Sequence, residues 1–195
     1  MFHLQTTVVK ANMRTHYGSH DILGSLAYNI CLLGRKHTGL DAKLPHNAKE
    51  LLISSFYAMV RRIWLAIMRK TDSTSELSDT LCPADINAAL LISDMFVYLE
   101  LFTTIKHGDT KRLQAILKLL TVMMSAGGSP PYTLELLQMD YGVRYAWTKV
   151  KAEAIFSSML MSTKGQEDSF IPLDLCQVFN NKLVMAPLTC CFLGV

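Results

Sequence analysis

A long apolar run in the middle of the chain constrains the fold more than any other feature. Ala84–Ile105 is apolar almost throughout, and its main interruptions are Asp85, Asn87, Ser93, Asp94, Glu100, Thr103 and Thr104. A helix that is apolar on nearly every side must be buried on several sides. The run therefore predicts a central buried helix within an all-α fold, an irregular helical bundle.

The residues after this run predict a tight turn into a second helix. Gly108 suits the left-handed residue that ends a helix, and Asp109 suits the cap that opens the next one. From Thr110, apolar residues recur at helical spacing, at Leu113, Ile116, Leu117, Leu120 and Met124. The two helices should form an αα-hairpin that buries one cluster, made of Leu90, Phe96, Phe102, Leu113, Leu117 and Leu120.

The rest of the chain predicts further helices and loops. Helices are expected over Met1–Thr15, Ile22–Leu33, Tyr132–Asp140 and Val143–Met161, with a short extended piece at Phe170–Leu175. Another helix should open with a capping box, Asn47 and Glu50, and bury a stripe made of Leu52, Phe56, Met59, Val60, Ile63 and Ile67. The polar residues Thr71–Thr80 predict a solvated loop.

Length and composition bound the domain organisation. A chain of 195 residues, half of them apolar, can bury a core of its own. We expect one helical domain over residues 1–184 and a divergent or unstructured tail over residues 185–195. Only 18% of the residues are charged, against about 25% in typical soluble domains. This deficit indicates either a partner-binding surface or a piece of a larger domain.

Charge and cysteine content indicate the environment of the protein. The net charge of +3 is too small to indicate nucleic-acid binding by itself. Five scattered cysteines without a C-x-x-C pair are typical of reduced thiols in an intracellular protein, in the nucleus or the cytoplasm. The long apolar run could span a bilayer by length, but it contains three carboxylates. We therefore expect a buried helix and no membrane contact.

Two polar features have the residue types of chemical sites, and each has a simpler structural explanation. His16 and His20 have the i, i+4 spacing of helical metal ligands, but Gly18 and Ser19 between them disfavour a helix. Loop histidines are the favoured interpretation. The carboxylate of Asp94 lies inside the apolar run, and we expect it to bond a neighbouring helix or cap a loop. The sequence thus predicts no catalytic residue, cofactor or metal ligand.

Basic residues around one helix end and its outer face form a candidate nucleic-acid contact. These are Lys111, Arg112 and Lys118, joined in the prediction by Arg61 and Arg62 of an earlier helix. Clustered basic side chains bind phosphates without reading base sequence. No aromatic residues alternate with them and no nucleic-acid-binding motif is present, so a solvated helix face is the favoured interpretation.

Several short motifs, in a shared order, resemble one protein family. The first block comprises Phe2-His3-Leu4, Thr15-His16 with Gly18, Gly24–Tyr28 and Leu33–Lys36. The central block comprises Ile105–Asp109, Leu117-Lys118, Tyr132, Glu135–Leu137 and Trp147. The last block runs from Asp174 through Gln177 to Asn181. From about Phe2 to Leu183 the chain thus resembles the fungal, transposon-associated domain-of-unknown-function family numbered six-five-eight-nine.

This resemblance implies an origin in mobile elements and, for the intact domain, a ribonuclease-H-like transposase. Its motif positions without an assigned role are His3, His16, Gly108, Asp109, Asp174 and Gln177. Such nucleases hold two metal ions with several carboxylates. The family's acidic "GDQL" segment precedes the first block matched here, and Val178 and Phe179 stand where the family has Glu and His. The resemblance therefore implies a truncated and degenerate copy.

Three functions follow as alternatives. We expect the first, a helical remnant of a transposon-derived domain that forms the C-terminal part of a larger family domain and lacks catalysis. The second is a helical module that binds a protein, or a second copy of itself, through apolar surface, or binds DNA weakly and nonspecifically. The third is part of a metal-dependent transposase-like nuclease, which needs an N-terminal part supplied elsewhere.

Overall fold

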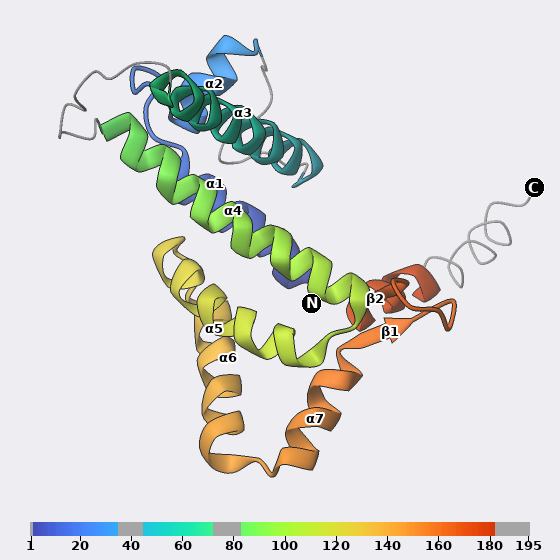
Figure 1. Cartoon of the computed structure of the whole chain (residues 1–195). Coiled ribbons are helices and arrows are strands. Elements are labelled where there is room, and N and C mark those ends of the chain that lie inside the picture. Colours follow the sequence, from blue (N-terminus) through green and yellow to red (C-terminus); the bar gives the residue numbers. More distant parts are fainter. Residues whose placement is uncertain (1, 35–44, 72–82, 182–195) are drawn as a thin grey trace, which may run out of the picture. The chain divides into compact units, whose positions relative to one another are not determined.

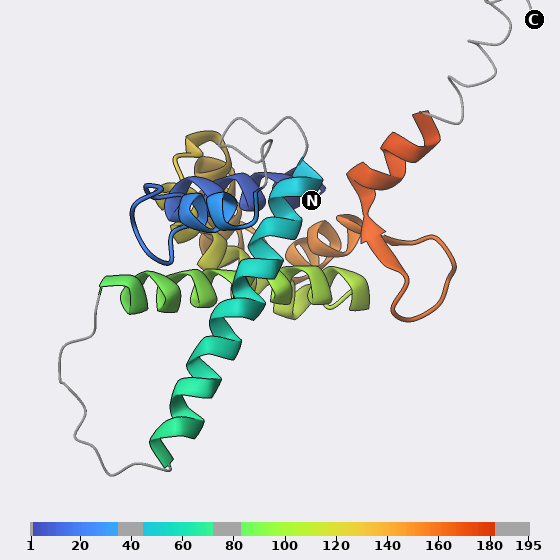
Figure 2. The ribbon, with the colours of Figure 1, turned by 90° about the horizontal axis from the view of Figure 1, so that it is seen from above.

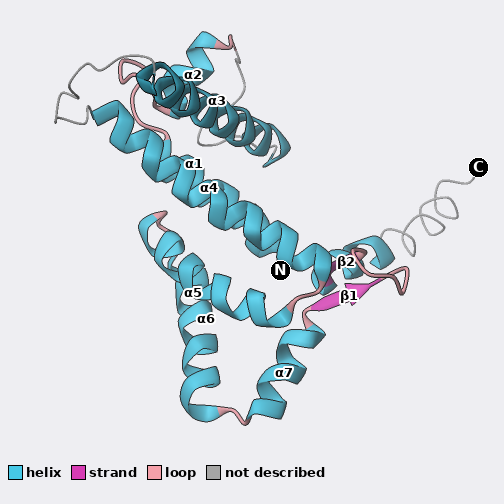
Figure 3. Cartoon of the chain, in the orientation of Figure 1, coloured by secondary structure: helices cyan, strands magenta, loops and turns pink. Residues whose placement is uncertain are grey.

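The structure of the protein is a computed structural model that describes residues 2–34, 45–71 and 83–181, and helices dominate these residues (Figure 1, Figure 3). The helices are α1 (Phe2–His16), α2 (Leu26–Leu32), α3 (Pro45–Thr71), α4 (Pro83–His107), α5 (Thr110–Ala126), α6 (Pro130–Tyr141), the π-helical turn η1 (Gly142–Ala146) and α7 (Lys149–Ser158). Residues 173–181 are helical as well. The predicted all-α fold is confirmed. A small antiparallel pair is added by β1 (Leu160–Ser162) and β2 (Phe170–Pro172).

The chain divides into two compact units, each built from separate stretches of sequence. The C-terminal unit comprises Met1–Gln5, Glu100–Thr121 and Pro131–Val195, and the N-terminal unit comprises Thr6–Leu99 and Val122–Pro130. The helices α1, α4 and α5 contribute residues to both units, as does α6 through its first residue, Pro130. The single helical domain over residues 1–184 stays a prediction, and the tail predicted over residues 185–195 lies outside the described residues.

The core of the N-terminal unit is lined by apolar side chains of α1, α2, α3 and α4. Its buried apolar side chains include Val8, Met13, Leu26, Ile30, Leu51, Leu52, Phe56, Leu91 and Met95. In α2, α3 and α4 such residues recur four positions apart, at Leu26 and Ile30, Leu52 and Phe56, and Leu91 and Met95, which puts them on one side of each helix. α1 is buried over more of its circumference, because Val9 and Ala11 are buried too. The amphipathic patterns of the sequence therefore account for this core.

α4 is a long helix as predicted, but it is buried along one stripe rather than on all sides. The stripe is Ala88, Leu91, Met95, Tyr98, Leu101 and Ile105. The predicted buried cluster is wrong in half of its members, since Leu90, Phe96 and Phe102 are 55%, 58% and 47% exposed. Leu113, Leu117 and Leu120 are buried as expected. A helix that is apolar all round shows no contrast between its faces, so its sequence cannot select the buried stripe.

The length and composition of α4 also fit a membrane span. The segment Asp85–His107 is long and apolar enough to cross a bilayer, a property that the core helices of soluble proteins share. Of this candidate span, 33% is buried within the structure, along the stripe described above.

The turn between α4 and α5 forms as the sequence predicts. Gly108 has a φ of +71°, its N–H bonds the carbonyl of Ile105 at 3.1 Å, and the N–H of Asp109 bonds the carbonyl of Thr104 at 3.2 Å. This is the Schellman pattern, which satisfies the last carbonyls of a helix. A Cβ at position 108 would also lie 2.8 Å from the ring of Phe170 in β2. Both backbone conformation and space therefore require glycine.

The helix predicted over Val143–Met161 is interrupted in the structure. α6 continues into η1, the chain bends at Trp147, and only then does α7 begin. A Cβ on Gly142 would lie 2.5 Å from the indole of Trp147, so the glycine makes room for this bend. The hydroxyl of Thr148 then caps α7. The apolar pattern runs through the bend unchanged, which explains why the sequence did not reveal it.

Other helix boundaries also differ from the predictions. α2 begins at Leu26 rather than Ile22, because the hydroxyl of Ser25 caps it by accepting a bond from the third backbone N–H after it at 3.0 Å. α3 begins at Pro45, so Asn47 lies inside the helix and does not open it. Proline suits the first helical position because that N–H has no partner within the helix. The predicted loop Thr71–Thr80 begins inside α3, and its other residues lie outside the described residues.

Candidate functional site

One face of the first half of α3 anchors this helix in the N-terminal unit. The buried residues of that half are Ala48, Leu51, Leu52, Ser55, Phe56 and Met59. Phe56 also meets Phe96 of α4 edge to face, with ring centroids 5.4 Å apart. The amide of Asn29 in α2 donates a hydrogen bond to the hydroxyl of Ser55 at 3.3 Å. Packing and polar contacts together therefore hold this half in place.

The second half of α3 extends away from the helices that hold its first half (Figure 2). The large apolar side chains that the structure describes there are between 37% and 61% exposed, and they are Val60, Ile63, Trp64, Leu65 and Met68. We call these five residues the α3 apolar face. Trp64 is the most exposed of them, at 61%. Large apolar side chains gathered on a surface mark interaction sites more often than single ones do.

α3 is also basic along this stretch. From Leu51 to Thr71 the sequence contains four basic residues and no acidic one; the basic residues are Arg61, Arg62, Arg69 and Lys70. Arg61 and Arg62, two of the predicted nucleic-acid contacts, are exposed. The guanidinium of Arg62 lies 3.5 Å from the carboxylate of Asp85 in α4. A basic amphipathic helix of this kind suits an acidic partner or an anionic surface.

A groove of about 430 Å³ in the N-terminal unit adjoins the α3 apolar face. It is lined by residues of α2, α3 and the start of α4, among them Leu32, Leu33, Met59, Ile63 and Ala88. Leu32 and Leu33 are 69% and 56% exposed. Ile63 belongs both to the groove and to the α3 apolar face, so the groove borders that face.

The other predicted nucleic-acid contacts lie on α5 in the C-terminal unit, and carboxylates engage most of them. Arg112 forms an ion pair with Glu100. The ammonium of Lys118 lies 3.9 Å from the carboxylate of Asp140, while Lys111 is exposed. A phosphate group would have to compete with these carboxylates. The structure therefore brings Lys111, Arg112 and Lys118 onto one helix, but not into a set of unengaged cations.

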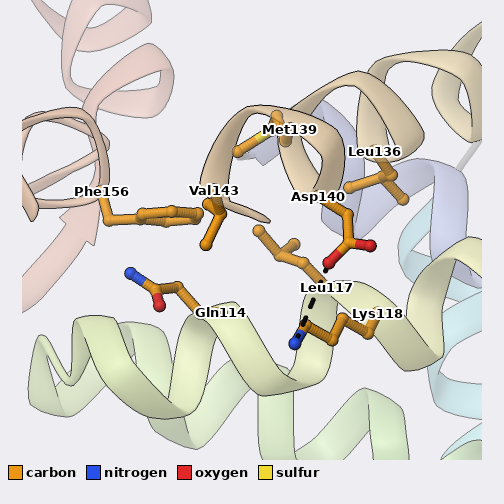
Figure 4. Close-up of a pocket in the computed structure, with 8 residues that line it drawn as sticks. All are labelled: Gln114, Leu117, Lys118, Leu136, Met139, Asp140, Val143 and Phe156. Carbon is orange, nitrogen blue, oxygen red and sulfur yellow. Dashed lines mark ion pairs between the residues drawn. The ribbon is translucent and has the colours of Figure 1, made fainter. Parts of the chain in front are cut away.

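Asp140 borders a small cavity in the C-terminal unit (Figure 4). Its carboxylate accepts a hydrogen bond from Nε of Arg144 at 2.7 Å, and this bond raises the pKa of the Arg144 guanidinium. The other carboxylate oxygen faces Lys118. The cavity measures about 20 Å³, which is room for about one water molecule. It is a gap in the packing around Leu117 and Phe156, and it is too small for an organic ligand.

The acidic family-motif positions serve as backbone caps. The carboxylate of Asp109 accepts bonds from the N–H groups two and three residues further on, at 3.1 and 3.0 Å, and so caps α5. The carboxylate of Asp174 accepts a bond from the backbone N–H of His3 at 3.1 Å, in the first turn of α1. A negative charge there is favourable for the helix dipole. Of the other positions, Gly108 ends α4 and Gln177 is exposed.

The two early histidines have separate partners. Nε2 of His16 lies 2.7 Å from the carboxylate of Asp94, with side chains 9% and 28% exposed. The expected partner of Asp94 on a neighbouring helix is thus confirmed. Nδ1 of His20 lies 3.1 Å from the carbonyl of Ala27 and 3.1 Å from the sulfur of Cys31. Within the described part of the chain, no three His, Cys, Asp or Glu side chains gather as metal ligands.

The fold and the surface define an all-α protein that presents a basic, partly apolar helix. The chain belongs to the family of unknown function DUF6589, whose model matches residues 1–88 and 84–186. The resemblance to this family is therefore confirmed. No curated protein and no solved structure matches the chain.

The sequence pattern did not predict the α3 apolar face. It assigned Val60 and Ile63 to a buried stripe, but they are 37% and 40% exposed. The last residue of that stripe, Ile67, lies outside the described side chains. The available signal was Trp64 and Leu65, which lie off the stripe on a helix half with basic residues and no acidic ones. With these two residues, apolar side chains cover a wider arc of α3 than the stripe that packs on the core.

Proposed function

We propose that this protein is a helical protein-binding module without catalysis of its own, derived from a fungal, transposon-associated domain. Binding is supported by one observation, the exposure of five large apolar side chains on the α3 apolar face. Soluble monomers seldom expose large contiguous apolar surfaces unless a partner covers them. The origin in mobile elements is supported by the resemblance described above.

The lack of catalysis is supported by what the acidic family-motif positions do. Asp109 and Asp174 both accept hydrogen bonds from backbone N–H groups at helix starts. A two-metal nuclease needs carboxylates that converge on metal ions beside the scissile phosphate. Carboxylates that cap helices contribute to folding instead. A nuclease completed by a separate N-terminal part stays a prediction.

Nonspecific DNA binding is the less favoured function. Arg62, Arg112 and Lys118 each lie beside a carboxylate. A phosphate would have to displace that carboxylate, and the displaced charge would repel it. Lys111 and Arg61 are the exposed cations that remain of the predicted five. Two such contacts would support only weak binding that falls steeply with salt.

Site-specific photo-crosslinking in the source cells tests the protein-binding function. A photoreactive residue replaces Leu65 in one version of the full chain and Val150 in the other. Both side chains are exposed and apolar, and Val150 lies in α7 of the C-terminal unit. We expect crosslinks to a defined protein from position 65 only. That protein, once purified, should bind the wild-type chain and not Trp64→Ala. Equal labelling from both positions, or none from position 65, would contradict the function.

A cleavage assay tests the lack of catalysis. The purified chain with magnesium or manganese should neither nick nor join DNA of any end structure. Metal-dependent cleavage that disappears in Asp174→Ala would overturn this part of the proposal and favour the nuclease.

A further inference from the structure

We infer that the partner of α3 is a protein with an apolar groove and an acidic rim, which wraps around the second half of this helix. The inference rests on the protein-binding function proposed above and adds the chemistry of the partner. It follows from the arc that the exposed apolar side chains cover and from the charges beside them.

The α3 apolar face covers too much of the helix for a flat contact. Successive residues of an α-helix are rotated by about 100°. On this basis, Ile63, Val60, Trp64, Met68 and Leu65 follow one another around an arc of roughly 200°. Two helices in simple contact share a narrower strip. A groove that encloses the helix on more than one side would bury all five residues.

The basic residues of α3 favour an acidic partner, and Arg61 carries most of this argument because Arg62 already lies 3.5 Å from the carboxylate of Asp85. The stretch Leu51–Thr71 has four basic residues and no acidic one. Arg61 falls within the apolar arc, between Met68 and Leu65, so the rim of the groove must accommodate its cation. Complementary charge at a rim directs partner choice and raises the association rate. A second copy of the chain would instead bring two basic helices together, and like charges disfavour that pairing.

A lipid surface fits these observations less well. A helix that lies in a membrane interface has one apolar side in the lipid and its charges on the other. Here Arg61 would enter the apolar layer together with Trp64 and Leu65. The carboxylate of Asp85, 3.5 Å from Arg62 and 47% exposed, would also weaken attraction to anionic lipid.

Trp64 is the central anchor that this partner would bury. It lies at the middle of the arc and is the most exposed member of the face, at 61%. Tryptophan and arginine are enriched among the residues that dominate interface energies. Truncation of Trp64 should therefore weaken binding more than any other single change on this face.

Titration calorimetry with a probe of this chemical class tests the inference. The probe is calcium-loaded calmodulin, an acidic protein whose open groove is apolar and rich in methionine; its calcium-free form is the control with a closed groove. The full chain should bind the calcium form only. Trp64→Ala should weaken this binding by about tenfold or more, the effect of a dominant interface residue. Arg61→Glu should weaken it and reduce its salt dependence. The control variants Val150→Ala and Lys111→Glu should bind as the wild type does.

Other outcomes would overturn the inference. Binding to phosphatidylserine vesicles without binding to the probe would indicate a lipid surface. Dimerisation in sedimentation that Trp64→Ala abolishes would indicate a second copy. Probe binding that neither α3 variant changes would indicate another surface. If the protein crosslinked at position 65 lacks an acidic groove, only the partner class is wrong. If nothing crosslinks there, the protein-binding function fails as well.

Discussion

α5 and the second half of α3 have similar sequence patterns, but their apolar side chains differ in burial. Both alternate apolar residues with basic ones at helical spacing. In α5 the apolar stripe is buried, at Leu113, Ile116, Leu117, Leu120 and Met124, and two of its cations pair with carboxylates. In α3 the five residues of the α3 apolar face, which follow Met59, are exposed. An amphipathic pattern thus predicts a helix with an apolar side, but not whether this chain or a partner covers that side.

Truncation of a core leucine in α5 should produce the largest effect. Leu117→Ala should lower the free energy of unfolding by about 2–5 kcal/mol, because it empties a buried leucine site. Leu119→Ala is the matched control on the same helix, since Leu119 is 54% exposed. It should cost about 0.5 kcal/mol or less. Equal losses in urea unfolding would show that α5 does not distinguish a buried side from an exposed one.

Removal of the histidine partner of Asp94 should cause the second-largest loss of stability. His16→Ala leaves that carboxylate without its 2.7 Å contact, and the loss of a partner for a partly buried polar group costs about 1–3 kcal/mol. Arg112→Ala is the contrast on α5, where both ion-pair side chains are at least 41% exposed. Exposed pairs contribute about 0–1 kcal/mol. Thermal unfolding of both variants checks this order, and a larger loss for Arg112→Ala would reverse it.

Loss of the α5 cap should have an intermediate effect. Asp109→Ala removes the acceptor of two backbone bonds and should cost about 1 kcal/mol. Asp109→Asn keeps an oxygen that can accept these bonds and should cost less. Urea unfolding measures both. If the two variants are equally unstable, the charge of Asp109 matters rather than its capping bonds.

The smallest effect on stability is expected on the α3 apolar face. Trp64→Ala should change the free energy of unfolding by about 0.5 kcal/mol or less, because this side chain is 61% exposed. Leu52→Ala, in the anchored half of the same helix, should cost about 2–5 kcal/mol. A large loss for Trp64→Ala, measured on the isolated chain, would mean that this face is covered within the chain.

The sequence-based predictions were right for features that depend on residues close together in the sequence. The turn at Gly108 and the Asp109 cap were predicted because their bonds join residues at most five positions apart. The helical spacing in α5 was equally visible, since one period of the pattern spans only a few residues. The DUF6589 family was also evident from the sequence, because its motifs are short and ordered.

Only the tertiary structure decided which apolar side chains are buried and what the polar ones bond. The contact of Asp174 with His3 joins positions 171 residues apart, and that of His16 with Asp94 joins positions 78 apart. α4 is apolar on most sides, so its buried stripe depends on where its neighbours lie. The same holds for α3, whose apolar side chains are buried in its first half and exposed at the α3 apolar face. Burial depends on which other parts of the chain surround a side chain, and the local sequence does not determine those neighbours.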